Sequence, residues 1–386
     1  MKHSVDKILT THAGSLPRNE EWLQMMIANE QGQKTDPKIY AAMNKQAVAE
    51  IVRTQLDLGV DIIDDGEAGK PSFLTYINER LGGFELSDAV RSPWKGSREV
   101  KAFPDYYEQM ARAGGGPGKA PRMVCRAPIT YKGHTQLKND IDNFKAALKG
   151  HDAGDAFIPA ISPGNIEDWQ QNEYYKTSEE YVFAIADAMH VEYKAIVDAG
   201  FLLQIDDPRF ASNYAMNEIT VEQHRHWAAI RVEALNQALK GIPEDRIRFH
   251  TCYSINMGPR VHDIELKHIV DLMLTIKAQA YSFETANPRH EHEWKVWETA
   301  KLTPGKIIIP GVISHTTMLV EHPELIAQWL VRFAKIVGRE NVIAGSDCGF
   351  ATFATSKEIH PSIVWAKFKS LVEGAQLASK ELWGRA

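Results

Sequence analysis

Hydrophobic residues along the chain gather in short runs, and these runs alternate with longer segments in which apolar residues recur every three or four positions. Short runs rich in β-branched residues predict buried strands, and the longer period predicts amphipathic helices. Strands that alternate with helices in this way are typical of parallel strands joined by crossover helices. The eight predicted strands span 8–15, 61–67, 156–162, 201–207, 246–252, 280–285, 307–313 and 342–348.

Helical spacing is clear between several of these strands. In the last such segment, apolar residues recur at Ile363, Val364, Phe368, Leu371 and Val372. Eight strands with intervening helices predict an α/β protein of the (β/α)8 barrel type. The predicted helices span 178–199, 221–240, 262–279, 322–337 and 358–378.

Two regions do not fit the simple alternation. Residues 17–45 form a polar excursion near the N-terminus, and residues 84–155 form a long insertion after the second strand. Within the insertion, 113–121 reads AGGGPGKAP, which is too rich in glycine and proline for a helix or a central strand. We expect the insertion to cap one face as a loop or hairpin arm. Length alone allows two domains, but the insertion lacks a core-sized apolar run, so we expect one barrel domain over 1–386.

Composition narrows the class of partner. The formal net charge is −6, and lysine and arginine are scattered without a basic run, which argues against a nucleic-acid or anionic membrane surface. No stretch approaches 18 consecutive apolar residues, and the N-terminal segment lacks the apolar core of a signal peptide. We therefore expect a cytoplasmic protein that acts on small molecules, and the sequence leaves a homo-oligomer open.

Polar residues collect where the predicted strands end, which is where a barrel carries its active site. A simpler interpretation exists for each of them, because acids cap helices, single histidines are commonly hydrogen-bonded in cores, and cysteines fill small spaces. That interpretation explains poorly why two cysteines, a histidine and a glutamate follow strands five, six and eight. The residues concerned are His12, Gly14, Ser15, Asp64, Asp65, Glu67, Asp206, Asp207, His250, Cys252, Glu284, His315, Asp347 and Cys348.

One subset of these residues has the composition of a zinc site. Side chains at positions i and i+2 of a strand point the same way, so His250 and Cys252 can bind one ion together. Thiolate sulfur and imidazole nitrogen are preferred zinc ligands, and Cys348 with the Glu284 carboxylate completes a tetrahedral set. Cys125 lies in the insertion, away from any predicted strand end of the barrel, and is not expected to be a ligand.

A family resemblance is carried by the segments TTHAGSLPR, DDGEAG, LQIDDP, FHTCYS, FETANP, PGVISHTT and GSDCGF. Their order and spacing resemble the catalytic barrel of cobalamin-independent methionine synthase, from about residue 8 to 378. The resemblance implies that His250, Cys252, Glu284 and Cys348 are zinc ligands. It also implies that Ala13, Gly14 and Ser15, together with Glu67 and Asp206, bind a homocysteine-like thiol, and that His315 donates a proton.

The sequence also departs from that family pattern. Ser254 stands where the family has a further cysteine that is not a ligand, and Trp169 is only a loose counterpart of the tryptophan that walls the folate site. Metal and thiol chemistry are therefore better supported than a methyl-folate donor.

These features predict an enzyme, a zinc-dependent methyl- or alkyltransferase that activates a thiol as a thiolate for attack on an electrophilic carbon. Its partners would be a small thiol and an alkyl donor, either a methyl-folate or an epoxide. One alternative is an epoxyalkane:coenzyme M transferase, whose sulfonated thiol would need a basic residue such as Arg18 or Arg209 in place of the acids Glu67 and Asp206. A second alternative is a non-catalytic zinc-containing barrel that binds a ligand.

Overall fold

The computed structural model describes residues 1–384 except 88–95, 113–121, 152–154, 255–257 and 355–358. The Gly/Pro-rich segment 113–121, which we expected to be neither helix nor central strand, lies outside the described residues. Within them, every one of the eight predicted strand regions contains a parallel strand. These strands are β1 (Leu9–Thr10), β2 (Ile62–Asp64), β5 (Asp155–Ile161), β7 (Leu202–Asp206), β8 (Ile247–His250), β9 (Ala280–Phe283), β10 (Ile307–Pro310) and β11 (Ile343–Ala344).

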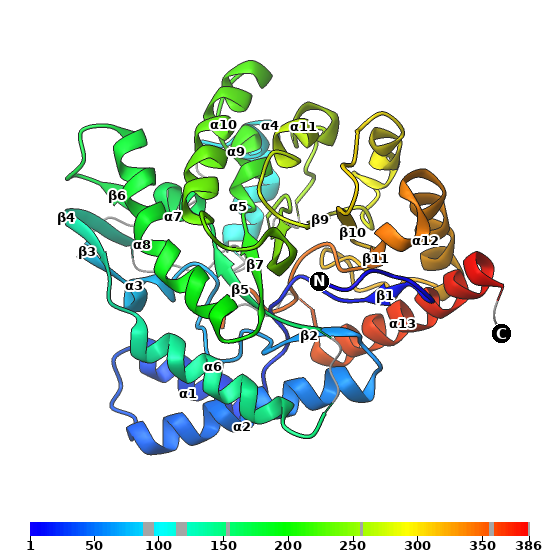
Figure 1. The fold of residues 1–386 in the computed structure, drawn as a ribbon. Helices are drawn as coiled ribbons and strands as arrows, with labels where there is room; N and C mark the ends of the chain where they lie inside the picture. The colour runs from blue at the N-terminus through cyan, green and yellow to red at the C-terminus, as the bar shows by residue number, and fades with distance from the viewer. Residues whose placement is uncertain (88–95, 113–121, 152–154, 255–257, 355–358, 385–386) are drawn as a thin grey trace.

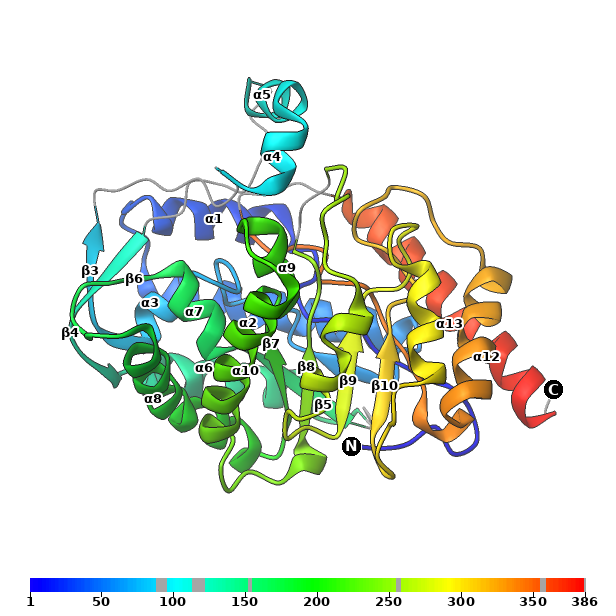
Figure 2. The same cartoon turned by 90° about the horizontal axis from the view of Figure 1, so that it is seen from above.

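The eight strands form a parallel barrel. Six of them are hydrogen-bonded in the order β10-β9-β8-β7-β5-β2, and β1 pairs with β11. Bridges from Ile308 to Val342 and from Gly311 to Gly345 join β10 to β11. Between β1 and β2, the Thr11 hydroxyl donates to the Ile62 carbonyl at 2.9 Å. The prediction of a (β/α)8 barrel fold is confirmed, and Figures 1 and 2 show the strands surrounded by helices.

The interior of the barrel is filled by alternate side chains of its strands. In β8, Ile247 and Phe249 belong to the large core between strands and helices. Arg248 points the opposite way, where its guanidinium lies 4.0 Å from the centroid of the Phe157 ring. This alternation carries His250 to the inner side at the end of the strand. A second cluster, drawn from six barrel strands, consists of Ile62, Phe157, Leu202, Ala280, Ile307, Ile309 and Ile343.

Most of the surrounding helices begin at a side-chain cap. Thr220 and Gln223 form a reciprocal capping box at α10, and Thr177 caps α8. His322 and His360 cap α12 and α13, each followed by a proline at the first helical position. The crossover helices are α2 (Pro37–Asp57), α6 (His134–Leu148), α8 (Ser178–Asp198), α10 (Val221–Ala238) and α12 (Pro323–Val337), and α13 (Pro361–Trp383) follows the last strand.

The predicted helix at 262–279 is wrong over most of its length. It contains only a 3-10 turn, Leu266–His268, and the short α11 (Val270–Met273). Apolar residues in this segment are buried, as Ile264, Leu266 and Ile276 show. The segment therefore packs as a largely irregular loop that buries these residues and exposes charged ones such as Lys267 and Asp271.

The two regions that departed from the alternation are mostly regular. The polar excursion holds α1 (Glu20–Glu30) and the start of α2, and Trp22 is fully buried there. After β2 and α3 (Ile77–Arg80), β3 (Leu81–Ser87) pairs with β4 (Arg122–Tyr131) in antiparallel fashion, as in a hairpin arm. The expected bounds of the insertion, 84–155, differ from this arm, because it begins at Leu81 and the range also contains the crossover helix α6. The short β6 (Gln171–Asn172) extends this sheet in parallel with β4.

Two short helices of the insertion, α4 (Arg98–Ala102) and α5 (Pro104–Arg112), project from the body in Figure 2. Arg98 anchors them, since it donates to the Asn217 carbonyl at 2.8 Å and stacks on the Tyr214 ring of α9 (Arg209–Met216) at 4.2 Å. The remaining helix, α7 (Pro163–Trp169), follows β5.

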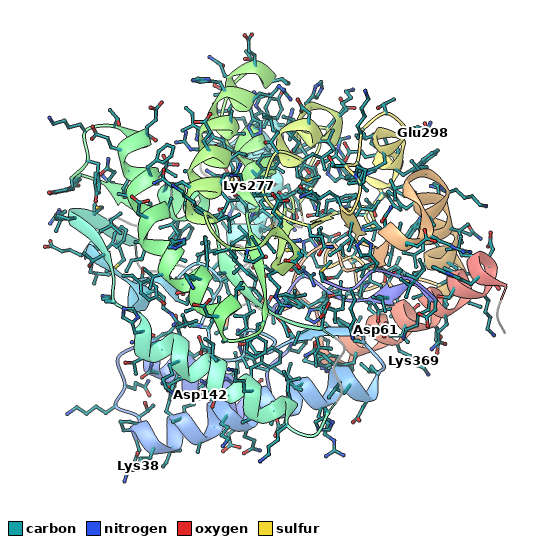
Figure 3. All side chains as sticks on the ribbon, in the orientation of Figure 1. Lys38, Asp61, Asp142, Lys277, Glu298 and Lys369 are labelled. Carbon is teal, nitrogen blue, oxygen red and sulfur yellow. The ribbon has the colours of Figure 1, made fainter. Side chains whose placement is uncertain are left out.

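Charged side chains of both signs point outward around the molecule, as Lys38, Asp142, Lys277 and Glu298 do in Figure 3. None of the helices in the described parts of the chain is long and apolar enough to cross a membrane.

Candidate active site

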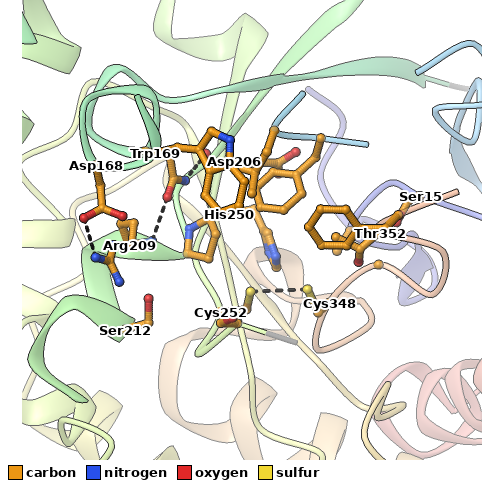
Figure 4. Close-up of a pocket in the computed structure, with 18 of the residues that line it drawn as sticks. Ser15, Asp168, Trp169, Asp206, Arg209, Ser212, His250, Cys252, Cys348 and Thr352 are labelled. Carbon is orange, nitrogen blue, oxygen red and sulfur yellow. Dashed lines mark hydrogen bonds and ion pairs between the residues drawn. The ribbon is translucent and has the colours of Figure 1, made fainter. Parts of the chain in front are cut away.

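Two strand ends bring a histidine and two cysteines together. β8 ends at His250, and Cys252 follows two residues later; Cys348 lies in the turn after β11. One ligand atom from each of the three side chains lies within 4.8 Å of the others, and all three side chains are buried. The two sulfur atoms are 3.2 Å apart as free thiols. Figure 4 shows this cluster, in which three of the four predicted metal residues, His250, Cys252 and Cys348, lie together.

The donor atoms in this cluster suit a soft divalent metal. Nδ1 of His250 is 3.1 Å from the Ser282 hydroxyl, whereas its Nε2 is buried and has no hydrogen-bond partner among the described residues. Burial lowers the pKa of His250 to about 3, so its imidazole is neutral, which is the form that binds a metal. The hydrogen bond with Cys252 and burial raise the pKa of Cys348 well above its usual value. Two sulfurs and one nitrogen fit zinc.

Glu284, the fourth expected ligand, is near the cluster but outside it. Its carboxylate accepts from the Tyr253 backbone N–H at 2.7 Å, from Arg260 at 3.0 Å and from Asn287 at 2.7 Å. Cys125, by contrast, lies in β4 and its thiol donates to the Ala127 carbonyl at 3.4 Å. Neither residue is in the three-residue group found among the described side chains.

The cluster opens into a cavity of about 870 Å³, including its mouth. Figure 4 shows Ser15 and Thr352 on one side of this cavity, Asp168, Arg209 and Ser212 on the other, and the cysteines between them. The lining residues are Ala13, Ser15, Glu67, Phe73, Leu74, Asn165, Asp168, Trp169, Asp206, Pro208, Arg209, Ser212, Met216, His250, Cys252, Ser254, Cys348, Gly349, Thr352 and Phe353.

Two buried carboxylates, Glu67 and Asp206, belong to the cavity wall. Burial first, and the nearby charge of Glu67 second, raise the pKa of Asp206 well above its usual value. Lys70 lies behind them, with its Nζ 3.7 Å from Oε1 of Glu67 and 2.5 Å from the Pro159 carbonyl. The positive charge of Lys70 thus compensates the two carboxylates, which would otherwise be buried without an opposite charge.

The backbone that presents Glu67 is strained. Its φ of 52° lies in the left-handed region, which is uncommon for a residue other than glycine. Arg18 holds this turn, because its guanidinium donates to the carbonyls of Glu67 at 2.8 Å and Lys70 at 2.7 Å. Arg18 is therefore committed to the backbone, and it does not belong to the cavity lining given above.

The segment after β1 lies against the cavity as expected. Ala13 and Ser15 line the cavity, and the Ala13 carbonyl accepts from the Gln204 amide at 2.6 Å. Gly14 has a φ of 132°, and a Cβ there would come within 3.3 Å of Pro159. A glycine at this position lets the backbone pass close to β5.

His315 is buried, with 1% of its surface exposed, and is not among the described residues that line the cavity. Burial lowers its pKa to about 4, and Glu284 opposes that shift. His315 in turn contributes to the low pKa of His250, so the two histidines are electrostatic neighbours.

The sequence alone did not identify several residues in the cavity wall or next to it. Lys70 could have been found from its spacing three residues after Glu67, since the turn between them brings i and i+3 together. Phe73, Met216 and Phe353 carry no chemical signature, and only the folded chain places them at the cavity. Trp169 and Ser254, which the resemblance singled out, both line it.

Comparison with known proteins places this site in a family. The family described as "Cobalamin-independent synthase, Catalytic domain" matches residues 8–111 and 160–368, which together make up most of the chain. The chain belongs to this family. The matched ranges contain every residue of this chain that was predicted to belong to the site. The unmatched range 112–159 falls mostly in the insertion.

Similar proteins span nearly the same length as this synthase-family chain. A methionine synthase of Thermococcus kodakarensis is 23% identical over 376 residues, which cover 97% of this chain and 94% of the relative. A methionine synthase of Saccharolobus solfataricus is 25% identical over 379 residues, which cover 97% and 95%.

Solved structures support the fold. A B12-independent methionine synthase from Shewanella sp. W3-18-1, in complex with selenomethionine, has a TM-score of 0.74 at 19% identity and covers 98% of this chain and 100% of its own. A structure described as a putative vitamin-B12 independent methionine synthase from Listeria monocytogenes has a TM-score of 0.67, with the same identity and coverage.

Proposed function

We propose that this protein is a zinc-dependent alkyltransferase that transfers a methyl or other alkyl group to the sulfur of an amino-acid thiol of the homocysteine type. The observation that carries the proposal is the meeting of His250, Cys252 and Cys348 in a cavity whose wall also contains Glu67 and Asp206. In the balanced reaction the thiol sulfur forms a bond to the alkyl carbon, the bond from that carbon to its leaving atom breaks, and the thiol proton ends on the leaving group.

The residues present fit zinc. His250, Cys252 and Cys348 would hold it, with Glu284 as the fourth protein ligand after its carboxylate is released from its present hydrogen bonds. Bound zinc would lower the pKa of a substrate thiol, so that the sulfur is a thiolate at neutral pH. The two cysteine sulfurs keep the site electron-rich, which favours a reactive thiolate over an activated water.

The acids Glu67 and Asp206 support an amino-acid thiol. They can bind an ammonium group while the sulfur end of the substrate reaches the cysteines in the same cavity. The two arginines considered for a sulfonate do not offer an equivalent site, because Arg18 binds backbone carbonyls and Arg209 pairs with Asp168. The charge pattern therefore favours homocysteine over coenzyme M as the thiol.

His315 is proposed as the group that delivers a proton to the leaving atom. Its low pKa means that it is neutral in the resting protein, so it would first accept the thiol proton and then pass it on. The names of the archaeal relatives, both methionine synthases, support a methyl group as the alkyl group transferred.

The test is a thiol-consumption assay of the zinc-loaded protein. Homocysteine and coenzyme M are each offered with methyl-tetrahydrofolate and with a small epoxide such as epoxypropane. The proposal expects homocysteine to be consumed with formation of methionine or an alkylated homocysteine. Preferential use of coenzyme M would favour the epoxide-opening alternative. If no thiol reacts with any donor while zinc remains bound, a non-catalytic zinc barrel is favoured.

A further inference from the structure

The wall of the cavity contains two buried hydrogen-bond donors that are not used within the protein. Arg209 and Ser212, one turn apart on α9, are 8% and 2% exposed, and both line the cavity. Nε of Arg209 and Oγ of Ser212 have no hydrogen-bond partner in the described part of the structure. Buried donors without acceptors are rare because they lose their water without compensation. Their position at a cavity indicates that a ligand supplies the acceptor.

The rest of the Arg209 guanidinium is already neutralised. Its Nη2 pairs with Oδ1 of Asp168, and the backbone N–H of Arg209 donates to Oδ1 of Asn165 at 3.2 Å. The guanidinium is thus fixed in place, and the Asp168–Arg209 pair carries no net charge. A second carboxylate would be repelled by Asp168, whereas a neutral carbonyl oxygen would accept from Nε and Oγ without that penalty.

The position of this pair separates it from Ser15, one of the residues expected to bind the thiol. Figure 4 shows Asp168, Arg209 and Ser212 across the cavity from Ser15 and Thr352, with Cys252 and Cys348 in between. Trp169 and Met216 line the same cavity and supply apolar surface for the body of a ligand.

We infer that Arg209 and Ser212 form a subsite for a neutral carbonyl oxygen, of the amide or ester kind, on the alkyl donor. The assignment to the donor rests on the proposed function, because that function places the thiol at Glu67 and Asp206. The carbonyl subsite would select donors by a group remote from the carbon that is transferred.

Equilibrium binding of three matched probes tests this subsite. Benzamide carries a neutral amide carbonyl, and benzoate carries a negatively charged carboxylate. Isopropenylbenzene has nearly the same shape but no hydrogen-bond acceptor. Each is titrated by calorimetry or ligand-observed NMR into the 386-residue parent protein and into its variants Ser212→Ala, Arg209→Lys and Thr352→Val. Thr352→Val is the matched control, because it removes a hydroxyl from the opposite side of the same cavity. Arg209→Lys keeps a cation beside Asp168, and Ser212→Ala keeps the test decisive if the lysine variant does not fold.

The inference expects benzamide to bind the parent protein at least about tenfold more tightly than isopropenylbenzene, and more tightly than benzoate, as two hydrogen bonds allow. Ser212→Ala and Arg209→Lys should each weaken benzamide by about fivefold and leave isopropenylbenzene unchanged, and Thr352→Val should change neither. Equal binding of benzamide and isopropenylbenzene, tighter binding of benzoate, or no saturable binding of benzamide would overturn it. Binding of these probes needs neither zinc nor thiol, so failure of the subsite and failure of thiol alkylation give separate results.

Discussion

At the scale of single residues, Cys252 and Cys348 are the side chains that we expect to hold zinc. Cys252→Ser and Cys348→Ser should each remove bound zinc and thiol alkylation while the far-UV circular dichroism stays that of a folded protein, because the core is built without the ion. Cys125→Ala is the matched control, since this cysteine is equally buried but lies in β4. Zinc determined by atomic absorption should stay near one equivalent in that variant. Loss of zinc from Cys125→Ala would mean that the wrong cysteines were assigned.

A second prediction at this scale concerns Glu67. Glu67→Gln removes the charge that we expect to meet the substrate ammonium. We therefore expect kcat/KM for homocysteine to fall by a factor that corresponds to about 2–4 kcal/mol of transition-state binding free energy, with zinc retained. Glu21→Gln, at an exposed position of α1, should leave the kinetics unchanged. Unchanged homocysteine kinetics in Glu67→Gln would instead indicate that this acid only supports the local fold.

Single residues also differ in how well the sequence predicts their positions. The grouping of His250, Cys252 and Cys348 was predictable because histidine and cysteine at strand ends carry a specific chemical signal. The position of Glu284 was not, because the hydrogen bonds that hold its carboxylate come from Arg260 and Asn287 in the neighbouring loops. Lys70 was missed although it follows Glu67 by three residues, because that spacing brings the two side chains together only where the chain forms a turn.

At the scale of elements, the close approach of β10 and β11 sets the position of Cys348. A Cβ on Gly311 would lie 2.2 Å from Oδ1 of Asp347 and 2.6 Å from its backbone nitrogen. Gly311→Ala should therefore destabilise the protein by about 1–3 kcal/mol in urea unfolding and lower its zinc content, since Cys348 follows Asp347 directly. Gly305→Ala is the control: it has a φ of +83° with no described atom within 4 Å, so only a conformational cost of about 1 kcal/mol is expected, with full zinc content. Full zinc content in Gly311→Ala would contradict this dependence.

The loop after β9 contains a buried histidine whose charge should stabilise the fold. Nδ1 of His290 is 2.8 Å from Glu293 and Nε2 is 3.2 Å from Asp263, and although burial opposes it, these hydrogen bonds raise the pKa of His290 to about 9. Because the folded pKa is above the unfolded value of about 6.5, the stabilisation is complete below about pH 6.5 and is lost as pH rises through about 9.

This difference predicts a loss of about 3 kcal/mol in the free energy of unfolding between pH 6 and pH 9.5. Urea titrations of the parent protein and of His290→Gln measure it. The pH-dependent loss should largely disappear in His290→Gln and persist in the control His151→Gln, whose side chain is exposed. Parallel pH profiles for the parent and His290→Gln would show that the histidine carries no such charge.

Prediction of elements succeeded where local pattern and burial agree. The strand β10, for example, is a short apolar run buried on both faces, so its sequence alone identifies it. The prediction for 262–279 was wrong because the spacing of its buried apolar residues resembles that of a helix, although only short turns of helix form there. The pairing of β3 with β4 depends on a long connection, and local sequence carries little information about such non-local pairing.

At the scale of the whole molecule, the fold should not depend on the metal. The cores inside and around the barrel together contain apolar residues from nearly every element, and zinc would touch only one end of the barrel. Removal of zinc with a chelator should therefore abolish thiol alkylation but leave the helical circular dichroism signal and a cooperative thermal transition. Cys252→Ser gives the matched zinc-free protein. Collapse of the helical signal on chelation would show instead that the ion is structural.

The central claim is that the metal held by His250, Cys252 and Cys348 binds the sulfur of an amino-acid thiol. Zinc K-edge X-ray absorption, recorded on the zinc-loaded protein with and without homocysteine, tests this claim most directly. We expect two sulfur neighbours of zinc without the thiol and three with homocysteine, whereas the same concentration of coenzyme M should leave the count at two. An unchanged sulfur count on addition of homocysteine would contradict it.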